Sequence, residues 1–199
     1  LLKEKGGRGF PYVTLMNAKG DVLWEFWPED KAAFDTAHNW ASKLTAFMTK
    51  AAATPEDKAL AASASLLDAC GRQQRPQSKS FADLEACAKV EGVNAEIMAM
   101  YKPKRIEMAM AAAQQDGGKA ILDMFKAGER PTGSSAIGFY YYGSRAAITA
   151  KDAENANKMV DLFEAAGAKN ERFRERAKTD AAKMREEIKA FAAPAEPAK

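Results

Sequence analysis

Two cysteines and one histidine are the side chains of this 199-residue sequence best suited to chemistry. Cys70 and Cys87 match neither the CxxC spacing nor the closely spaced ligand pairs of zinc sites. Because His38 is the single histidine, we do not expect a zinc site. Two interpretations of the cysteines stay open. They could form a disulfide between two predicted helices across the polar loop at 72–79, or they could be two small buried hydrophobic side chains.

His38 and the tryptophans favour packing over catalysis. His38 lies beside Trp40 in a predicted helix, and we expect a surface or boundary histidine rather than a general base. Trp24, Trp27 and Trp40 could make an aromatic binding patch, but such residues more often seal a hairpin onto a helix. A phosphate loop and a nucleophile elbow are absent from the sequence. We therefore predict no catalytic residue, no metal site and no cofactor in this chain.

A β-hairpin over 12–27 is the first element that the sequence predicts. Its strands, 12–16 and 22–27, are apolar and partly β-branched, and NAKGD between them supplies the Asn and Gly of a tight turn. From Glu29 the apolar residues recur at helical spacing, which predicts an amphipathic helix over 30–50.

Helices fill the rest of the chain. Caps and breakers predict one from N-cap Thr54 to Gly71, one from cap Ser80 to Gly92, one over 94–115 with a break or kink at Pro103, one around Ile121 to Phe125, and three at about 134–150, 152–166 and 170–191. The last of these has a single apolar stripe and should pack on one side only, as a terminal helix does. The fold class is therefore mostly α with a small β-hairpin (α+β), and its helices form antiparallel helical hairpins.

Charge and hydropathy narrow the classes of partner. The 30 basic and 27 acidic residues are scattered and give a net charge of +3, without a basic run that would follow a phosphate backbone, so we expect no nucleic acid partner. No apolar run approaches the roughly 18 to 20 residues that span a bilayer, so we expect no membrane span. The start, LLKEKGG, lacks the pattern of a signal peptide and has no initial Met, which favours a processed or shortened piece of a longer protein.

The string GRGFPYVTLMNAKGDVLWEF resembles the second half of a thioredoxin-like domain. Gly9, Phe10 and Pro11 match its cis-proline loop, and the predicted hairpin and first helix match its last two strands and closing helix. In that family the backbone groups beside the cis proline receive a substrate chain as an added strand. The resemblance implies that Gly9, Phe10 and Pro11 bind a protein or peptide client. The alternative is a trans Pro11 that simply begins a strand.

One departure from this family bears on activity. Thioredoxin-like enzymes carry a redox CxxC well upstream of the cis proline, and no CxxC occurs in this sequence. Without a reactive thiolate we expect no thiol–disulfide exchange from this chain alone. The resemblance implies a bacterial extracytoplasmic parent protein, and hence a periplasmic or secreted location.

A second, shorter resemblance lies in the helical part. The segment AIGFYYYGSRAAITAKDAENANKMVDLFEAA resembles a tetratricopeptide unit, because Ile137, Gly138 and Tyr141 keep its L-G-x-x-Y spacing and DAENA with Phe163 resembles its second helix. Such arrays bind peptides, so the resemblance makes Tyr140 to Tyr142 candidate contacts. Three consecutive side chains cannot all face the same way on a helix.

These observations predict three segments: 1–52 as the C-terminal part of a thioredoxin-like domain, 53–192 as a helical domain, and 193–199 as a disordered Ala/Pro tail. The first hypothesis is the C-terminal portion of a thioredoxin-like protein whose parent performs thiol–disulfide exchange or client binding. The alternative is a non-catalytic protein–protein interaction module built from helical hairpins. A third is an unrelated helical domain with an incidental hairpin. A CxxC upstream of Pro11 would favour the first over the second.

Overall fold

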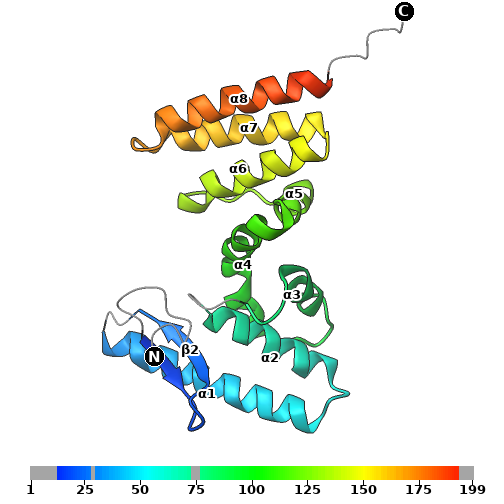
Figure 1. Cartoon of the computed structure of the whole chain (residues 1–199). Coiled ribbons are helices and arrows are strands. Elements are labelled where there is room, and N and C mark those ends of the chain that lie inside the picture. Colours follow the sequence, from blue (N-terminus) through cyan, green and yellow to red (C-terminus); the bar gives the residue numbers. More distant parts are fainter. Residues whose placement is uncertain (1–12, 28–29, 73–76, 193–199) are drawn as a thin grey trace, which may run out of the picture. The chain divides into compact units, whose positions relative to one another are not determined.

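The computed structural model describes residues 13–27, 30–72 and 77–192, and they form a mostly helical protein with a small β-hairpin, as predicted. The chain divides into two compact units, 1–104 and 105–199 (Figure 1).

The first unit begins with an antiparallel hairpin of β1 (Val13–Met16) and β2 (Val22–Phe26). Asn17 organises the turn, because its Oδ1 accepts hydrogen bonds from the backbone N–H groups of Lys19 and Asp21, both at 2.9 Å. Gly20 has a φ of 84°, which glycine adopts without steric cost. The predicted hairpin is confirmed over its described residues.

The helices of this unit are α1 (Lys31–Ala53), α2 (Lys58–Gly71), α3 (Phe81–Ala88) and the first part of α4 (Ala95–Asp116). Trp24 of β2 stacks on Trp40 of α1, with ring centroids 6.3 Å apart, and it is only 6% exposed. A Cβ at Gly71 of α2 would lie 2.6 Å from Cε3 of Trp24, so the ring also closes against α2. Trp24 and Trp40 therefore seal the hairpin onto the helices, as predicted, whereas Trp27 is exposed.

Because α2 packs on both α1 and β2, the boundary expected between 52 and 53 falls inside the first compact unit. The hairpin and the first two helices share one apolar core.

The junction between α1 and α2 corrects one prediction. Thr54 is the C-cap of α1 and not the N-cap of α2, since its backbone N–H donates to the carbonyl of Lys50 at 3.0 Å. Asp57 caps α2 instead and accepts from the N–H of Leu60 at 2.9 Å. A carboxylate at a helix N-terminus also benefits from the helix dipole, which favours Asp57. Ser80 caps α3 as predicted.

A break or kink is the sequence expectation at Pro103, and of these the break is absent, because α4 continues through this residue. Proline removes one backbone hydrogen bond from a helix. The turns before it are held by buried side chains, with Ile97 and Tyr101 almost fully enclosed. Packing therefore retains the helix in spite of the proline.

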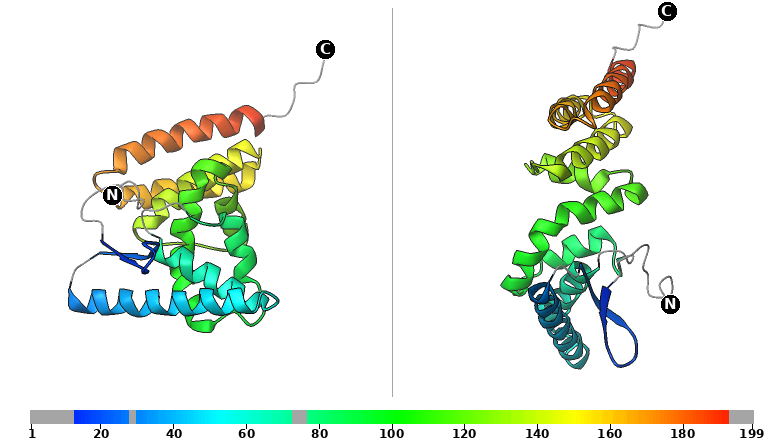
Figure 2. Two further views of the ribbon diagram at one scale, coloured as in Figure 1. Left: turned by 60° about the horizontal axis from the view of Figure 1, so that its bottom comes forward. Right: turned by 90° about the vertical axis from the view of Figure 1, so that its left-hand side faces the viewer.

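The second unit consists of the rest of α4 with α5 (Lys119–Lys126), α6 (Ser134–Thr149), α7 (Ala153–Ala168) and α8 (Arg174–Ala192). Helices α6, α7 and α8 run antiparallel in succession, and α7 contacts both of the others (Figure 2). Glycine permits these close approaches. A Cβ at Gly143 of α6 would lie 2.8 Å from Sδ of Met159, and one at Gly167 of α7 would overlap the Cβ of Ala177 of α8.

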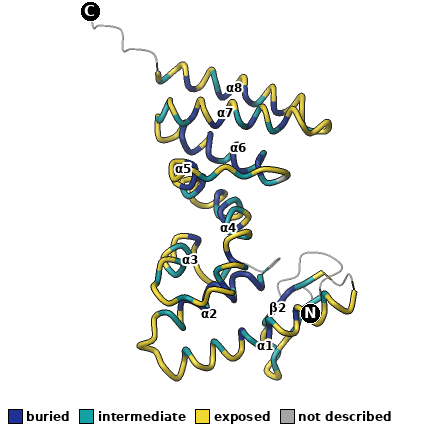
Figure 3. Tube along the Cα trace, turned by 180° about the vertical axis from the view of Figure 1, so that it is seen from behind, coloured by how far each residue is buried: buried dark blue, intermediate teal, exposed yellow. Residues whose placement is uncertain are grey.

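Helix α8 buries one stripe, made of Ala177, Ala181, Met184 and Ile188. Exposed positions recur between them along the helix (Figure 3). This agrees with the predicted one-sided packing of a terminal helix. The Ala/Pro tail predicted at 193–199 lies outside the described residues.

Candidate functional site

The residues that the thioredoxin resemblance nominates for client binding, Gly9, Phe10 and Pro11, lie outside the described residues. The strand that follows them is described. Within the described part of the chain, β1 pairs with β2 alone. Its second edge has no strand partner there.

The two cysteines are free thiols in this structure, on the neighbouring helices α2 and α3. Cys70 is buried, and that burial raises the pKa of its thiol to about 11, although the positive charge of Lys104 acts in the opposite direction. The Nζ of Lys104 donates to the backbone carbonyl of Cys70 at 2.7 Å. Cys70 is therefore a protonated, enclosed side chain at neutral pH and a poor nucleophile. Cys87 is partly exposed, and its pairing with Cys70 stays a prediction.

His38 lies on the exposed side of α1, where its ring stacks on Phe34 with centroids 6.2 Å apart. This is the surface position that the sequence predicted.

In the part of the chain that is described, no three His, Cys, Asp or Glu side chains come together to hold a metal ion. No described helix is both long enough and apolar enough to cross a membrane.

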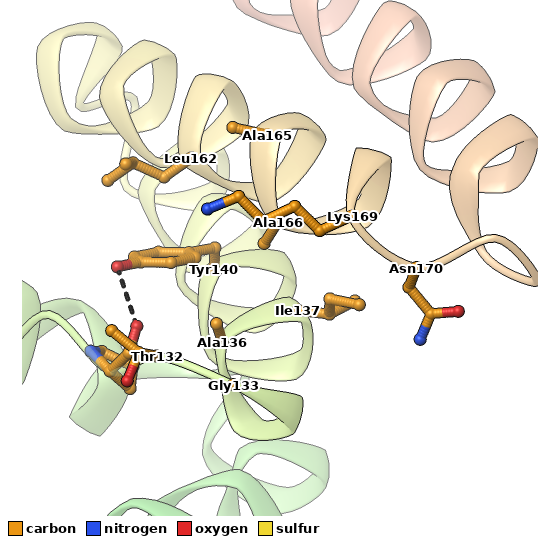
Figure 4. A pocket seen from close by; sticks show the side chains of 11 residues that line it. Thr132, Gly133, Ala136, Ile137, Tyr140, Leu162, Ala165, Ala166, Lys169 and Asn170 are labelled. Atoms are coloured by element: carbon orange, nitrogen blue, oxygen red, sulfur yellow. Dashed lines mark hydrogen bonds between the residues drawn. The ribbon is translucent and has the colours of Figure 1, made fainter.

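A pocket of about 500 Å³ lies in the second unit, between α6, the end of α7 and the loop before α6 (Figure 4). Its lining residues are Pro131, Thr132 and Gly133 of the loop, Ala136, Ile137 and Tyr140 of α6, Leu162, Ala165 and Ala166 of α7, and Lys169 and Asn170 after α7. The walls are mainly apolar, and polar groups stand at the floor and the rim.

The loop that forms one wall is fixed by the end of α5. Gly128 has a φ of 97° and donates its N–H to the carbonyl of Phe125, while the N–H of Glu129 returns to the carbonyl of Met124, each at 3.0 Å. This pair of bonds is a Schellman motif, which requires a positive φ and so favours glycine. The guanidinium of Arg130 lies 3.7 Å from the centroid of the Phe125 ring and also donates to the carbonyl of that residue. The wall is therefore held in place.

Tyr140 forms the floor of the pocket and is 5% exposed. Its Oη donates to the carbonyl of Pro131 at 3.4 Å, a long bond, and accepts none from the described residues (Figure 4). Burial raises the pKa of this phenol, with Arg130 acting in the opposite direction, so the hydroxyl stays protonated at neutral pH. The Tyr140 hydroxyl at the floor can therefore accept a hydrogen bond from a ligand, or donate to the ligand as well as to Pro131.

Two polar side chains from the turn after α7 complete the rim. Lys169 is exposed and extends back along α7, so that its ammonium lies on the side of the pocket where Tyr140 ends (Figure 4). Asn170 stands at the other end, and its backbone N–H donates to the carbonyl of Gly167 at 3.0 Å. A cation, a phenol and an amide therefore surround an apolar pocket.

One residue that the tetratricopeptide resemblance nominates lies at this pocket. Tyr140, one of three candidate tyrosines, lines the pocket, whereas Tyr141 contacts Phe163 with ring centroids 5.6 Å apart. Tyr142 does not line the pocket and contacts the Tyr141 ring. Lys169 was missed, because only the packing of α7 on α6 brings it to the pocket rim.

Comparisons with protein-family models, with curated proteins and with solved structures found no match to this chain.

Proposed function

We propose that this protein is a non-catalytic protein–protein interaction module that binds a peptide segment of a client in the pocket between α6 and α7. The observation that carries the proposal is the pocket itself, with apolar walls and a few polar groups at its floor and rim. Binding sites commonly combine mostly apolar walls with a small number of polar groups that orient the ligand.

Two features of the chain's chemistry support binding over catalysis. The Cys70 thiol is buried and protonated at neutral pH, and His38 stacks on an exposed aromatic ring. Neither of them lines the pocket. A pocket whose lining contains no Cys, His, Asp or Glu suits recognition.

The test uses the full chain and amide NMR chemical-shift mapping with short peptides that are acetylated and amidated at their ends. Ala165→Trp fills the pocket mouth from an exposed position, and Ala182→Trp is its matched control on the exposed side of α8. We expect peptides to shift the amide resonances of 132–140 and 162–170 in the wild type and in Ala182→Trp, but not in Ala165→Trp. If no peptide shifts these resonances in the wild type, the proposal is wrong.

A second candidate concerns the first unit. We propose that the hairpin and α1 are the closing part of a thioredoxin-like domain, and that the parent protein, periplasmic or secreted, performs thiol–disulfide exchange or client binding. The order strand, turn, strand and packed helix supports this candidate, as does the edge of β1 without a strand partner among the described residues. Met16, Phe34 and Met48 are about half exposed, which suits a surface covered by further structure.

This candidate makes two claims that can be tested. Insulin reduction by the 199-residue chain should be absent, because the chain has no CxxC. A gene extended upstream should encode a CxxC before Pro11. Insulin reduction by the present chain would contradict the claim that the reactive thiol is missing from these 199 residues, and an extended reading frame without a CxxC would favour the non-catalytic interaction module.

A further inference from the structure

The lining of the α6–α7 pocket contains a positive charge and no negative charge. Lys169 is a cation, Tyr140 and Asn170 are neutral, and none of the lining residues is acidic. Several other cations of the second unit lie against carboxylates, for example Arg145 against Glu187 at 2.8 Å. Lys169 has no carboxylate within ion-pair distance among the described residues. The pocket therefore presents a positive charge that an anionic partner would neutralise.

The backbone around the pocket has the same electrostatic preference. The first turn of α6 lines the pocket, and Gly133 at its N-cap provides no side-chain cap hydrogen bond. The N-terminus of a helix carries partial positive charge. The end of α7 has the opposite sign, and two of its last carbonyls already accept hydrogen bonds, Gly167 from Asn170 and Ala168 from Nε of Arg174. The positive groups at the pocket are therefore Lys169 and the N-terminus of α6, and both favour an anion.

Apolar side chains lie directly beside these polar groups. Ile137 lines the pocket from α6 and Leu162 lines it from α7. Ala166 lies next to the side chain of Lys169 (Figure 4). A bare inorganic anion would leave these walls in contact with water. A carboxylate with apolar neighbours would use both parts of the pocket.

We infer that the pocket selects a client segment in which an acidic side chain is flanked by apolar residues. The inference rests on the proposed peptide-binding function and names its ligand class. The acidic side chain lies at the end formed by Lys169 and Tyr140, and the apolar neighbours lie against Ile137 and Leu162. A hydrogen bond with a charged partner is stronger than a neutral one, so the carboxylate supplies selectivity as well as affinity.

The test compares three peptides on the full-length chain, each acetylated at its N-terminus. The first is Ala-Leu-Asp-Leu-Ala amide, the second is the same peptide with Asn in place of Asp, and the third is the Asn peptide with a free C-terminal carboxylate. Affinity is measured by NMR titration and repeated at raised salt. We expect the Asp peptide to bind about tenfold more tightly than the Asn amide, and this preference should decrease with salt.

Charge-removing variants locate the selectivity. Lys169→Gln should abolish the preference for Asp over Asn, because it removes the positive charge of the pocket lining. Lys178→Gln removes an equivalent exposed charge on α8, outside the pocket, and should keep the preference.

The outcomes separate the inference from the function beneath it. Equal binding of the Asp and Asn amides at the pocket overturns the inference and leaves the peptide-binding function intact, as does a preference that survives Lys169→Gln. Tightest binding of the free-carboxylate peptide also overturns it, in favour of recognition of a chain end. Absence of binding by all three peptides overturns the inference. The chemical-shift mapping with other short peptides on the wild type and on Ala165→Trp then decides whether the proposed function fails as well.

Discussion

Replacing Gly167 with Ala would place a methyl group where α7 and α8 touch. A Cβ at this position would overlap the Cβ of Ala177 and lie 3.7 Å from its Cα, whereas non-bonded carbon atoms rest about 3.5–4.0 Å apart. Ala177 is 1% exposed and has no side-chain torsion that could move its Cβ away, so the two helices would have to separate. Overpacking of this kind costs about 1–3 kcal/mol in the free energy of unfolding. Replacing a helical glycine returns at most about 1 kcal/mol.

The assay is urea unfolding followed by circular dichroism, with hydrogen exchange of the α7 amides as a local probe. All three tryptophans lie at or before position 40, so tryptophan fluorescence would report mainly on the first unit. Gly138→Ala is the control, because its close neighbour is Sδ of Met110, the outer part of a flexible side chain, and we expect a change below about 1 kcal/mol.

A double-mutant cycle makes the test specific. Adding Ala177→Gly to Gly167→Ala removes the opposing methyl group, so the double variant should be more stable than the sum of the single effects predicts by at least about 1 kcal/mol. If Gly167→Ala is neutral, or if the two substitutions are additive within about 0.5 kcal/mol, the close approach of α7 and α8 is not as described.

Three further results are expected. A hydrogen bond from Nζ of Lys126, at 2.7 Å, lowers the pKa of Asp152 from 3.8 to about 2. Because the folded pKa lies below the unfolded one, the stabilising effect of this carboxylate is complete above about pH 4 and is lost as the pH falls toward 2. Asp152→Asn should therefore lower the unfolding free energy at pH 7 and differ little from wild type near pH 2 in urea titrations. Lys151 has a φ of 56°, and Lys151→Gly should raise the unfolding free energy by about 0.5–1 kcal/mol in thermal unfolding; a loss of stability would contradict this. A thiol reagent should modify Cys87 well before Cys70 in the native protein, because Cys70 is buried and its pKa is raised; if neither reacts until a reductant is added, they form the disulfide.

The hairpin was predictable because its signals are local. Asn17 and Gly20 meet the requirements of a tight turn within a few residues, and the structure contains the corresponding hydrogen bonds and positive φ.

Cap positions were harder to predict. Thr54 and Asp57 are both good caps, and their roles depend on how far packing against α2 extends α1. At Pro103, too, local preference and packing compete. Proline disfavours the interior of a helix, but the buried side chains before it hold α4 in place.

The sequence alone determined the mostly helical class, the hairpin, and the absence of a redox motif and of a charge run within these 199 residues, because each of these depends on residue type and short-range spacing. Only the tertiary structure decided that Tyr140 and Lys169 border one pocket while Tyr141 packs on Phe163. The reason is that these contacts join residues that lie far apart in the sequence. A helical period tells which side chains share a face, but which faces meet depends on packing between helices, for example where Gly143 of α6 leaves room for the side chain of Met159 of α7.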